Sequence, residues 1–284
     1  VIDEQLWEKE NGRWQLVMKV MVKDGCVTTR ELTKAVAGAL NRRMIPEKDT
    51  KTLIGKGVNL YTYEEEPRFQ AIYGVARMVK DGAAVSGDNF SFLEPESGKM
   101  VMCLSDGMGS GSLACKESEM VIELVEKFLE AGFDVETAAR MMNSAMVMKG
   151  QEDLFSTVDI SELDLYDGTC RFYKIGAAAT FIRRNGIVEC LISTSLPVGV
   201  SYKLDMEKSE KDLYNGDFLV MVSDGVLEYL HVPNPEETMQ EIIESIETNN
   251  ATILAKRILE RVLLFTGGKA ADDMTVLATA IWEK

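Results

Sequence analysis

Histidine and long apolar runs are nearly missing from this chain of 284 residues, which contains one histidine. A Ser–His–Asp catalytic site could use only His231, which lies in the proline-containing segment HVPNP. No apolar stretch is long enough to span a bilayer, and no signal peptide is visible. Because residue 1 is Val rather than Met, we expect the sequence to be a piece of a longer protein, and a membrane segment elsewhere in that protein stays open.

Paired cysteines and an excess of basic charge are also missing. The five cysteines include no C-x-x-C pair, which argues against a zinc site, and their scatter fits a reducing compartment. None of them begins a C-x5-R phosphate loop. With 31 Lys and Arg against 46 Asp and Glu, the net charge of −15 argues against a nucleic-acid-binding protein, which needs a basic surface. Any hydrolysis by this chain would therefore have to use carboxylates and metal.

Two segments of the chain end in the same tripeptide, Ser-Asp-Gly: MVMCLSDG ends at Gly107 and FLVMVSDG at Gly225. A short apolar run bounded by a turn signal predicts a buried strand. Glycine permits a sharp turn where a side chain would clash. The sequence therefore predicts that Asp106 and Asp224 lie at the ends of two central strands.

Two further acidic sites have similar surroundings. Asp88 lies in SGDNFSF before one candidate strand, and Asp272 and Asp273 lie in ADDMTVLATAIW before another. Aspartates repeated at strand ends predict one shared site for hard cations, and an oxygen-only ligand set favours Mg²⁺ or Mn²⁺. The alternative is that each Asp-Gly is simply a turn, which is our interpretation of Asp167-Gly168.

Within such a site, Asp106 suits a bridging position, because Gly107 leaves its own carbonyl open to a metal. Asp224 and Asp272 would hold one ion, while Asp88 and the Gly107 carbonyl would help to hold the other. Two ions a few ångströms apart can activate a water and bind phosphoryl oxygens. The glycines of GMGSGS suggest a phosphate-binding loop as a rival, but the lysine of such loops is missing and a flexible loop explains them as well.

The chain divides by pattern into residues 1–68 and 69–284. The first part contains two short strands about Gly12, a helix over 29–43 with one apolar face, and a connector with Pro and Gly. The second part reads as strands, two helices, strands, two helices and a last strand, which predicts an α+β layered domain. Its four predicted helices cover residues 114–133, 134–149, 236–248 and 250–265.

The motifs SGDNF, LSDGMGSG, LPVG, GDFLVMVSDGV and DDMTV occur in an order that resembles the PPM (type 2C-like) family of metal-dependent serine/threonine protein phosphatases, in particular its bacterial branch. The resemblance covers roughly residues 69–284. It implies an αββα sandwich of two antiparallel sheets flanked by helix pairs, with two Mn²⁺ or Mg²⁺ ions at one end. Residues 1–68 would then be a regulatory or linker segment.

Site residues carry over by motif. Asp106 matches the bridging aspartate and Gly107 the carbonyl ligand of the family. Asp224 matches the aspartate of the second Asp-Gly motif, and Asp88 matches the early acidic ligand. Asp106 and Asp224 would act in catalysis indirectly, by holding the metal ions that bind the reacting water.

Two positions depart from the family pattern. Asp272 matches the last metal ligand, but Asp273 follows it where many relatives have Asn, so the choice between these neighbours stays open. Many eukaryotic members follow Asp-Gly with a histidine proposed as general acid, and here that residue is Met108. The resemblance therefore implies direct attack by a metal-activated water, with no phosphoenzyme and with the leaving-group proton taken from another source.

The resemblance also implies a phosphoserine or phosphothreonine protein as substrate, specifically an anti-sigma-factor antagonist whose dephosphorylation activates a sigma factor in sporulation. The full-length protein would be membrane-anchored, with this soluble piece on the cytoplasmic side. A shift of the helices over 114–149 could make or break the metal site under the control of residues 1–68, and either part could form a homodimer. The alternatives are a fixed helical layer, a catalytically silent interaction module on the same fold, or a hydrolase of small phosphoesters.

Overall fold

The computed structural model describes residues 1–9, 12–23, 25–47, 50–96, 98–109, 111–148, 155–265, 267–270 and 272–284. Contacts divide the chain into two compact units, Val1–Pro67 and Arg68–Lys284, here called the N-terminal and the C-terminal unit. The roles predicted for residues 1–68 and 69–284 stay predictions. No helix in the described ranges is long and apolar enough to cross a membrane.

The N-terminal unit packs one helix on a small antiparallel sheet. The predicted strand pair about Gly12 is present, with Glu8 opposite Trp14. The helix is fixed by a capping box at its start, where Thr28 and Glu31 bond reciprocally, and by Asn41 in a left-handed conformation at its end. Its elements are the sheet in the order β1 (Asp3–Glu8), β2 (Trp14–Val20), β6 (Asn59–Glu65), β4 (Met44–Pro46), the pair β3 (Val27–Thr28) and β5 (Leu53–Ile54), and α1 (Thr29–Leu40).

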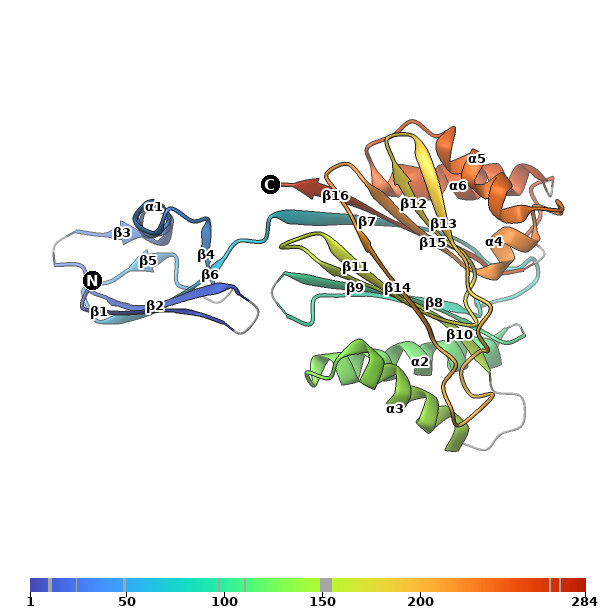
Figure 1. The fold of residues 1–284 in the computed structure, drawn as a ribbon, viewed down its shortest axis with the longest axis horizontal. Helices are drawn as coiled ribbons and strands as arrows, with labels where there is room; N and C mark the ends of the chain where they lie inside the picture. The colour runs from blue at the N-terminus through green and yellow to red at the C-terminus, as the bar shows by residue number, and fades with distance from the viewer. Residues whose placement is uncertain are drawn as a thin grey trace. The chain divides into compact units, whose positions relative to one another are not determined.

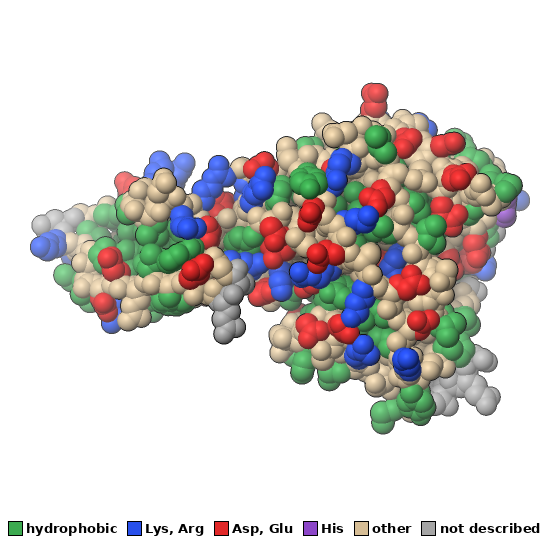
Figure 2. Space-filling model, in the orientation of Figure 1, with side chains coloured by type: hydrophobic (Ala, Val, Ile, Leu, Met, Phe, Trp, Pro, Cys, Tyr) green, Lys and Arg blue, Asp and Glu red, His purple; other side chains and the backbone are tan. Residues whose placement is uncertain are grey.

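The apolar face of α1 lies on the core of this unit. Val36 is buried, and Leu32 and Leu40 are partly buried against the same cluster, as their spacing predicted. The face is not fully covered, because a cavity of about 300 Å³ lies between α1 and the sheet, lined among others by Leu6 and Leu16. Hydrophobic side chains gather on the face of this unit seen in Figure 2.

The C-terminal unit is an αββα sandwich, which confirms the predicted architecture. Two five-stranded antiparallel sheets face each other, with α2 and α3 outside one and α4, α5 and α6 outside the other (Figure 1). The first sheet has the order β14 (Glu207–Asp212), β11 (Thr169–Ile175), β10 (Ser156–Asp164), β9 (Lys99–Gly107), β8 (Asp88–Leu93). The second has the order β13 (Ile187–Leu191), β12 (Thr180–Arg184), β15 (Phe218–Val222), β16 (Met274–Glu283), β7 (Phe69–Met78). The helices are α2 (Ser112–Glu130), α3 (Val135–Met148), α4 (Asp224–Glu228), α5 (Pro235–Glu244) and α6 (Ala251–Phe265).

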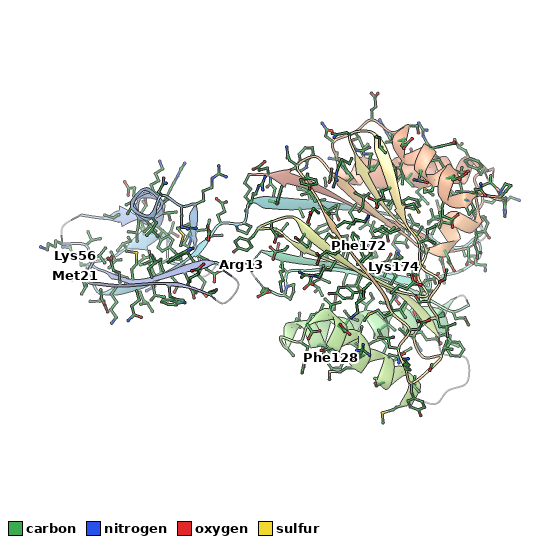
Figure 3. All side chains as sticks on the ribbon, viewed as in Figure 1. Arg13, Met21, Lys56, Phe128, Phe172 and Lys174 are labelled. Carbon is green, nitrogen blue, oxygen red and sulfur yellow. The ribbon has the colours of Figure 1, made fainter. Side chains whose placement is uncertain are left out.

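Three apolar layers hold the sandwich together: one between the sheets and one under each group of helices. Alternate residues of each strand supply the two layers beside it, because successive side chains point to opposite faces. Figure 3 shows Phe172 of β11 in the interior of this unit and Phe128 on α2. Phe172 belongs to the layer between the sheets and is fully buried.

The helices differ from the prediction in some details, and α1 ends at Leu40 rather than at residue 43. The sequence predicts that Met120, Leu124, Phe128 and Leu129 point inward. Leu129 is buried as predicted, but the other three are only partly buried beside a core face that Val121, Val125 and their neighbours form. Residue 149, the predicted end of the second helix, lies outside the described residues.

Two further differences lie around the second helix pair. Helix α5 ends at Glu244, four residues early, because the Arg183 guanidinium binds the carbonyls of Ile246 and Thr248 and draws the chain away. The short helix α4, directly after the second Ser-Asp-Gly, was not predicted.

Truncating the inter-sheet layer should destabilise the C-terminal unit far more than truncating an exposed aromatic. Phe172→Ala should lower its free energy of unfolding by about 3–5 kcal/mol, the usual cost of emptying a buried phenylalanine site. The matched change Phe265→Ala removes a side chain that is 48% exposed and should cost less than about 1 kcal/mol. Urea unfolding of both variants checks this, and equal shifts would contradict the proposed core.

Candidate metal centre

A cavity of about 310 Å³ opens in the C-terminal unit where strands of both sheets end. The predicted residues Asp106, Gly107, Asp224, Asp272 and Asp273 all line it. Sites more than a hundred residues apart in the sequence thus meet at one edge of the sandwich. Asp88, the remaining predicted ligand, is not part of the lining and is fully buried in the strand beside Asp106.

The end of β9 is held on both sides. Asp106 lies opposite Asp88 on β8 and opposite Thr157 on β10. The Ser156 hydroxyl donates to the Asp106 carbonyl at 2.6 Å, and the Asp106 N–H donates to the Thr157 hydroxyl at 3.3 Å. These contacts fix the backbone of Asp106 while leaving its side chain at the cavity.

The Asp88 carboxylate is in an unusual state for a buried acid. Both of its oxygens lack a hydrogen-bond partner among the described residues. Burial, reinforced by the charges of Asp224 and Asp273, raises its pKa from 3.8 to about 6, although the nearby hydroxyls of Thr275 and Ser223 act in the opposite direction. A buried carboxylate without donors is a costly group unless something positive completes its surroundings.

The Asp106 carboxyl is perturbed further in the same direction. Burial raises its pKa far above the usual range, and the adjacent carboxyl groups of Asp224 and Asp88 raise it more. Three carboxyl groups therefore interact with one another, and neighbouring like charges favour retention of protons. A divalent cation among them would remove this repulsion, so the residues present fit the metal centre that the sequence predicts.

The two Ser-Asp-Gly glycines are needed for space rather than for an unusual turn. A Cβ on Gly107 would lie 2.1 Å from the Ala114 carbonyl oxygen, and one on Gly225 would lie 2.1 Å from the Asp273 carbonyl oxygen. Neither glycine has a positive φ. The predicted clash is thus confirmed at both positions: each glycine lets two backbone segments touch beside the aspartate that precedes it, without a left-handed backbone conformation.

The structure separates the roles of the two neighbouring acids. The Asp273 carboxylate is 5% exposed and accepts backbone N–H bonds from Lys80 at 2.9 Å and Gly87 at 2.7 Å. Asp272 is more exposed, and its nearest cation is the Lys80 ammonium at 3.5 Å. Asp273 therefore ties the loop before β8 to the start of β16, and Asp272 is freer to meet an ion.

Some features of the site differ from, or go beyond, the sequence analysis. Among the described residues, no three His, Cys, Asp or Glu side chains are already gathered as metal ligands, so the acidic set would have to draw together around an ion. Lys80 lines the cavity and was not singled out from the sequence, where nothing marks it. Met108 also lines the cavity and is 54% exposed, whereas His231 does not line it.

The αββα sandwich with acidic strand ends around one cavity defines a phosphatase domain of the PP2C, or PPM, class. Residues 96–281 match the family model described as Stage II sporulation protein E (SpoIIE). The chain therefore belongs to the SpoIIE family.

Relatives of known sequence agree with this membership. Stage II sporulation protein E of Bacillus subtilis (strain 168) is 29% identical over 278 residues, which is 98% of this chain and 34% of that protein. The protein of the same name from Priestia megaterium is 34% identical over 209 residues, or 73% of this chain and 36% of the relative. Phosphoserine phosphatase RsbX of B. subtilis is 35% identical over 86 residues, 30% of this chain and 41% of RsbX. The chain thus spans about a third of the length of the first two relatives.

Solved structures share the fold. The PP2C phosphatase domain of SpoIIE from B. subtilis, with a fragment of its regulatory domain, has a TM-score of 0.79 at 27% identity, over 99% of this chain and 82% of that chain. RsbX in complex with magnesium has a TM-score of 0.56 at 20% identity, over 75% and 95% of the two chains. The catalytic domain of PstP with two manganese ions has a TM-score of 0.58 at 17% identity, over 76% and 100%.

The pKa of Asp88 predicts how stability depends on pH. Because the folded pKa of about 6 exceeds the ordinary 3.8, the protonated form stabilises the metal-free fold. This contribution is complete below about pH 4 and is lost as the pH rises through about 6. Between these values, the Tm of the metal-free chain should fall relative to that of Asp88→Asn, which carries no such charge.

Bound metal should restore the stability that the metal-free chain loses when Asp88 ionises. At pH 7, Mn²⁺ at a hundred times its Kd should stabilise the parent chain by about 2.7 kcal/mol, while EDTA abolishes the gain. Differential scanning fluorimetry from pH 4 to 8, with Mn²⁺ or EDTA, measures both effects. Parallel pH profiles of parent and Asp88→Asn would contradict the assignment of Asp88.

Proposed function

We propose that this chain is a metal-dependent serine/threonine protein phosphatase that hydrolyses a phosphoserine or phosphothreonine of a regulatory protein. The observation that carries the proposal is the buried Asp88 carboxylate, without donors, beside Asp106 and Asp224 at a cavity. Membership of a family with PP2C-type phosphatase domains supports it.

The proposed ligands of two Mn²⁺ or Mg²⁺ ions are the side chains of Asp88, Asp106, Asp224 and Asp272 and the carbonyl of Gly107. All are hard oxygen donors, which is the chemistry that these ions prefer. Magnesium in RsbX and two manganese ions in PstP, which share the fold, support this choice. When bound, such ions would supply an activated water and a positive charge for the phosphoryl oxygens.

Electrostatics gives a reason why metal must precede substrate. The cavity is lined by Asp106, Asp224, Asp272 and Asp273, and Lys80 alone among the described lining residues is basic. A phosphate dianion would be repelled by such a wall. The leaving serine or threonine oxygen also needs a proton, and Met108 cannot donate one. The proton must therefore come from water or from another group of the site.

Family membership supports a proposal for the substrate class. We propose a phosphorylated anti-sigma-factor antagonist, whose dephosphorylation leads to sigma-factor activation in sporulation. In the whole protein, residues 1–68 would be regulatory, a membrane anchor would hold the phosphatase on the cytoplasmic side, and a homodimer would form through residues 1–68 or the pair α2 and α3. The name of the family, which refers to sporulation, supports this setting.

A catalytically silent module on the same fold is the second candidate. The acidic side chains of the described residues are not yet gathered as a ligand set, as expected of such a module. All of the predicted acidic positions are nevertheless filled, and burying Asp88 without donors is costly if nothing ever binds there.

Phosphate release from a phosphoserine protein tests the function directly. Activity should require Mn²⁺ and disappear with EDTA. Asp106→Ala and Asp224→Ala should each lower kcat/KM by more than the 10- to 100-fold that is typical of groups outside the ligand shell, so by at least about 100-fold.

Asp167→Ala is the matched control for this assay. Asp167 also precedes a glycine, but its carboxylate accepts the Thr169 N–H at 2.8 Å in a hairpin turn of the same unit. It should keep full activity. A folded parent chain without turnover in ample Mn²⁺ would favour the silent module, and turnover of p-nitrophenyl phosphate alone would favour a small-phosphoester hydrolase.

The neighbours Asp272 and Asp273 should separate binding from stability. Asp272→Asn should weaken Mn²⁺ binding, since it removes a carboxylate charge from the lining of the cavity. Asp273→Asn should instead leave one backbone N–H facing an amide NH₂, and so lower the free energy of unfolding by about 1–3 kcal/mol. Calorimetric Mn²⁺ titration and urea unfolding measure the two quantities, and a reversed pattern would reassign the ligand to Asp273.

A further inference from the structure

Three polar side chains form a buried cluster between the two sheets, here called the buried tie (Asp159, Lys174 and Thr180). The Lys174 ammonium donates to Asp159 at 2.5 Å and to the Thr180 hydroxyl at 2.8 Å. The Thr180 hydroxyl in turn donates to Asp159 at 2.5 Å. The side chains of Lys174 and Asp159 are 4% and 2% exposed. Figure 3 shows Lys174 in the interior of the C-terminal unit, on the same strand as Phe172.

Such a cluster needs a reason other than stability. Desolvating a lysine and an aspartate costs about as much as their attraction returns, so apolar replacements of a buried ion pair are often neutral or stabilising. The surrounding inter-sheet layer is apolar, and it includes Leu104, directly opposite Asp159, and Met221, directly opposite Thr180. Three apolar side chains could have completed this layer, so the role to look for in the tie is the positioning of the strands that it connects.

The tie joins the two sheets rather than two parts of one sheet. Asp159 on β10 lies directly opposite Lys174 on β11. Both strands belong to the sheet that carries Asp106, whereas Thr180 begins β12 of the other sheet.

Each end of the tie is connected, through a neighbouring residue of its sheet, to a strand that carries or leads to a predicted metal ligand. On β10, Thr157 is two residues before Asp159, so the two side chains share one face, and Thr157 lies opposite Asp106 and accepts its N–H. On β12, Thr180 lies opposite Met221 of β15, the strand that ends at Val222, just before Ser223 and Asp224. The tie therefore connects the strand that supports Asp106 with the strand that delivers Asp224.

We propose that Lys174, Asp159 and Thr180 are positioning residues for the metal centre: their buried tie fixes the distance between the sheets so that Asp106 and Asp224 can share an ion. The inference rests on the proposed metal-dependent function. Directional bonds of this kind hold two sheets at one spacing, whereas apolar contacts alone tolerate small slides. Loss of the tie weakens metal binding before it unfolds the protein.

Calorimetric titration of the full chain with Mn²⁺ tests this inference without relying on turnover. Thr180→Val removes only the hydroxyl at constant shape, and it should raise the Kd for Mn²⁺ by about tenfold, or about 1.4 kcal/mol of binding free energy. Thr180→Ser keeps the hydroxyl and should bind like the parent. The double variant Lys174→Met/Asp159→Leu removes both charges together, which avoids one stranded buried charge, and should raise the Kd at least as much as Thr180→Val. In both weakened variants, kcat at saturating Mn²⁺ should fall less than the Mn²⁺ affinity does.

Arg184→Met is the matched control, because it breaks an ion pair of the same unit that does not line the cavity. Arg184 binds the buried Asp217 at 2.7 Å. This change should lower the Tm and leave the Kd for Mn²⁺ unchanged. An equal rise of the Kd in Arg184→Met would overturn the inference, because any loss of stability would then have the same effect.

The remaining outcomes are distinct. If Thr180→Val and the double variant lose stability but bind Mn²⁺ like the parent, the tie is merely structural and the inference is wrong. If the parent binds Mn²⁺ and the variants bind it less tightly, but no phosphate is released, the inference holds and the proposed phosphatase fails. If the parent binds no Mn²⁺, both are overturned.

Discussion

Mutual repulsion of carboxylates at the seam between two sheets is the constraint on which the rest of this structure depends. Asp88 and Asp106 come from one sheet and Asp224 from the end of a strand in the other. Burial raises the pKa of Asp88 and Asp106, and the nearby carboxyl groups raise both pKa values further. Side chains alone would move apart. The rigid sandwich, with an apolar layer on each face of each sheet, holds them together.

The backbone enforces this meeting at close range. Gly107 and Gly225 allow chain segments to approach where any Cβ would clash. Asp273 binds two N–H groups of the loop that precedes Asp88, and the tie about Lys174 connects the strands beneath Asp106 and Asp224. The fold thus holds carboxyl groups near one another although they repel, and bound cations would remove this repulsion. The fold thus brings the acidic residues to one edge of the sandwich in advance, and only their side chains have to draw together around an ion.

Much of the site was predictable because its signal is local. Apolar runs ending in Ser-Asp-Gly predicted the strands that deliver Asp106 and Asp224, and the alternation of strand and helix segments predicted the layered fold. Lys80, by contrast, lies in an ordinary loop, and Lys174 and Asp159 lie in strands otherwise buried among apolar residues. Lys80 acquires a role only from residues almost two hundred positions later, and the contacts of Lys174 with Asp159 and Thr180 form only when neighbouring strands pair and the two sheets pack.

The sequence by itself determined which strands end in acids and which segments form helices, because periodicity and turn residues act over a few neighbouring positions. The tertiary structure decided the rest. It separated the fastened Asp273 from the freer Asp272, showed that the Ser-Asp-Gly glycines provide space, and joined the two sheets through Thr180. Each of these features depends on how the two sheets pack against each other, and a local sequence pattern does not specify that packing.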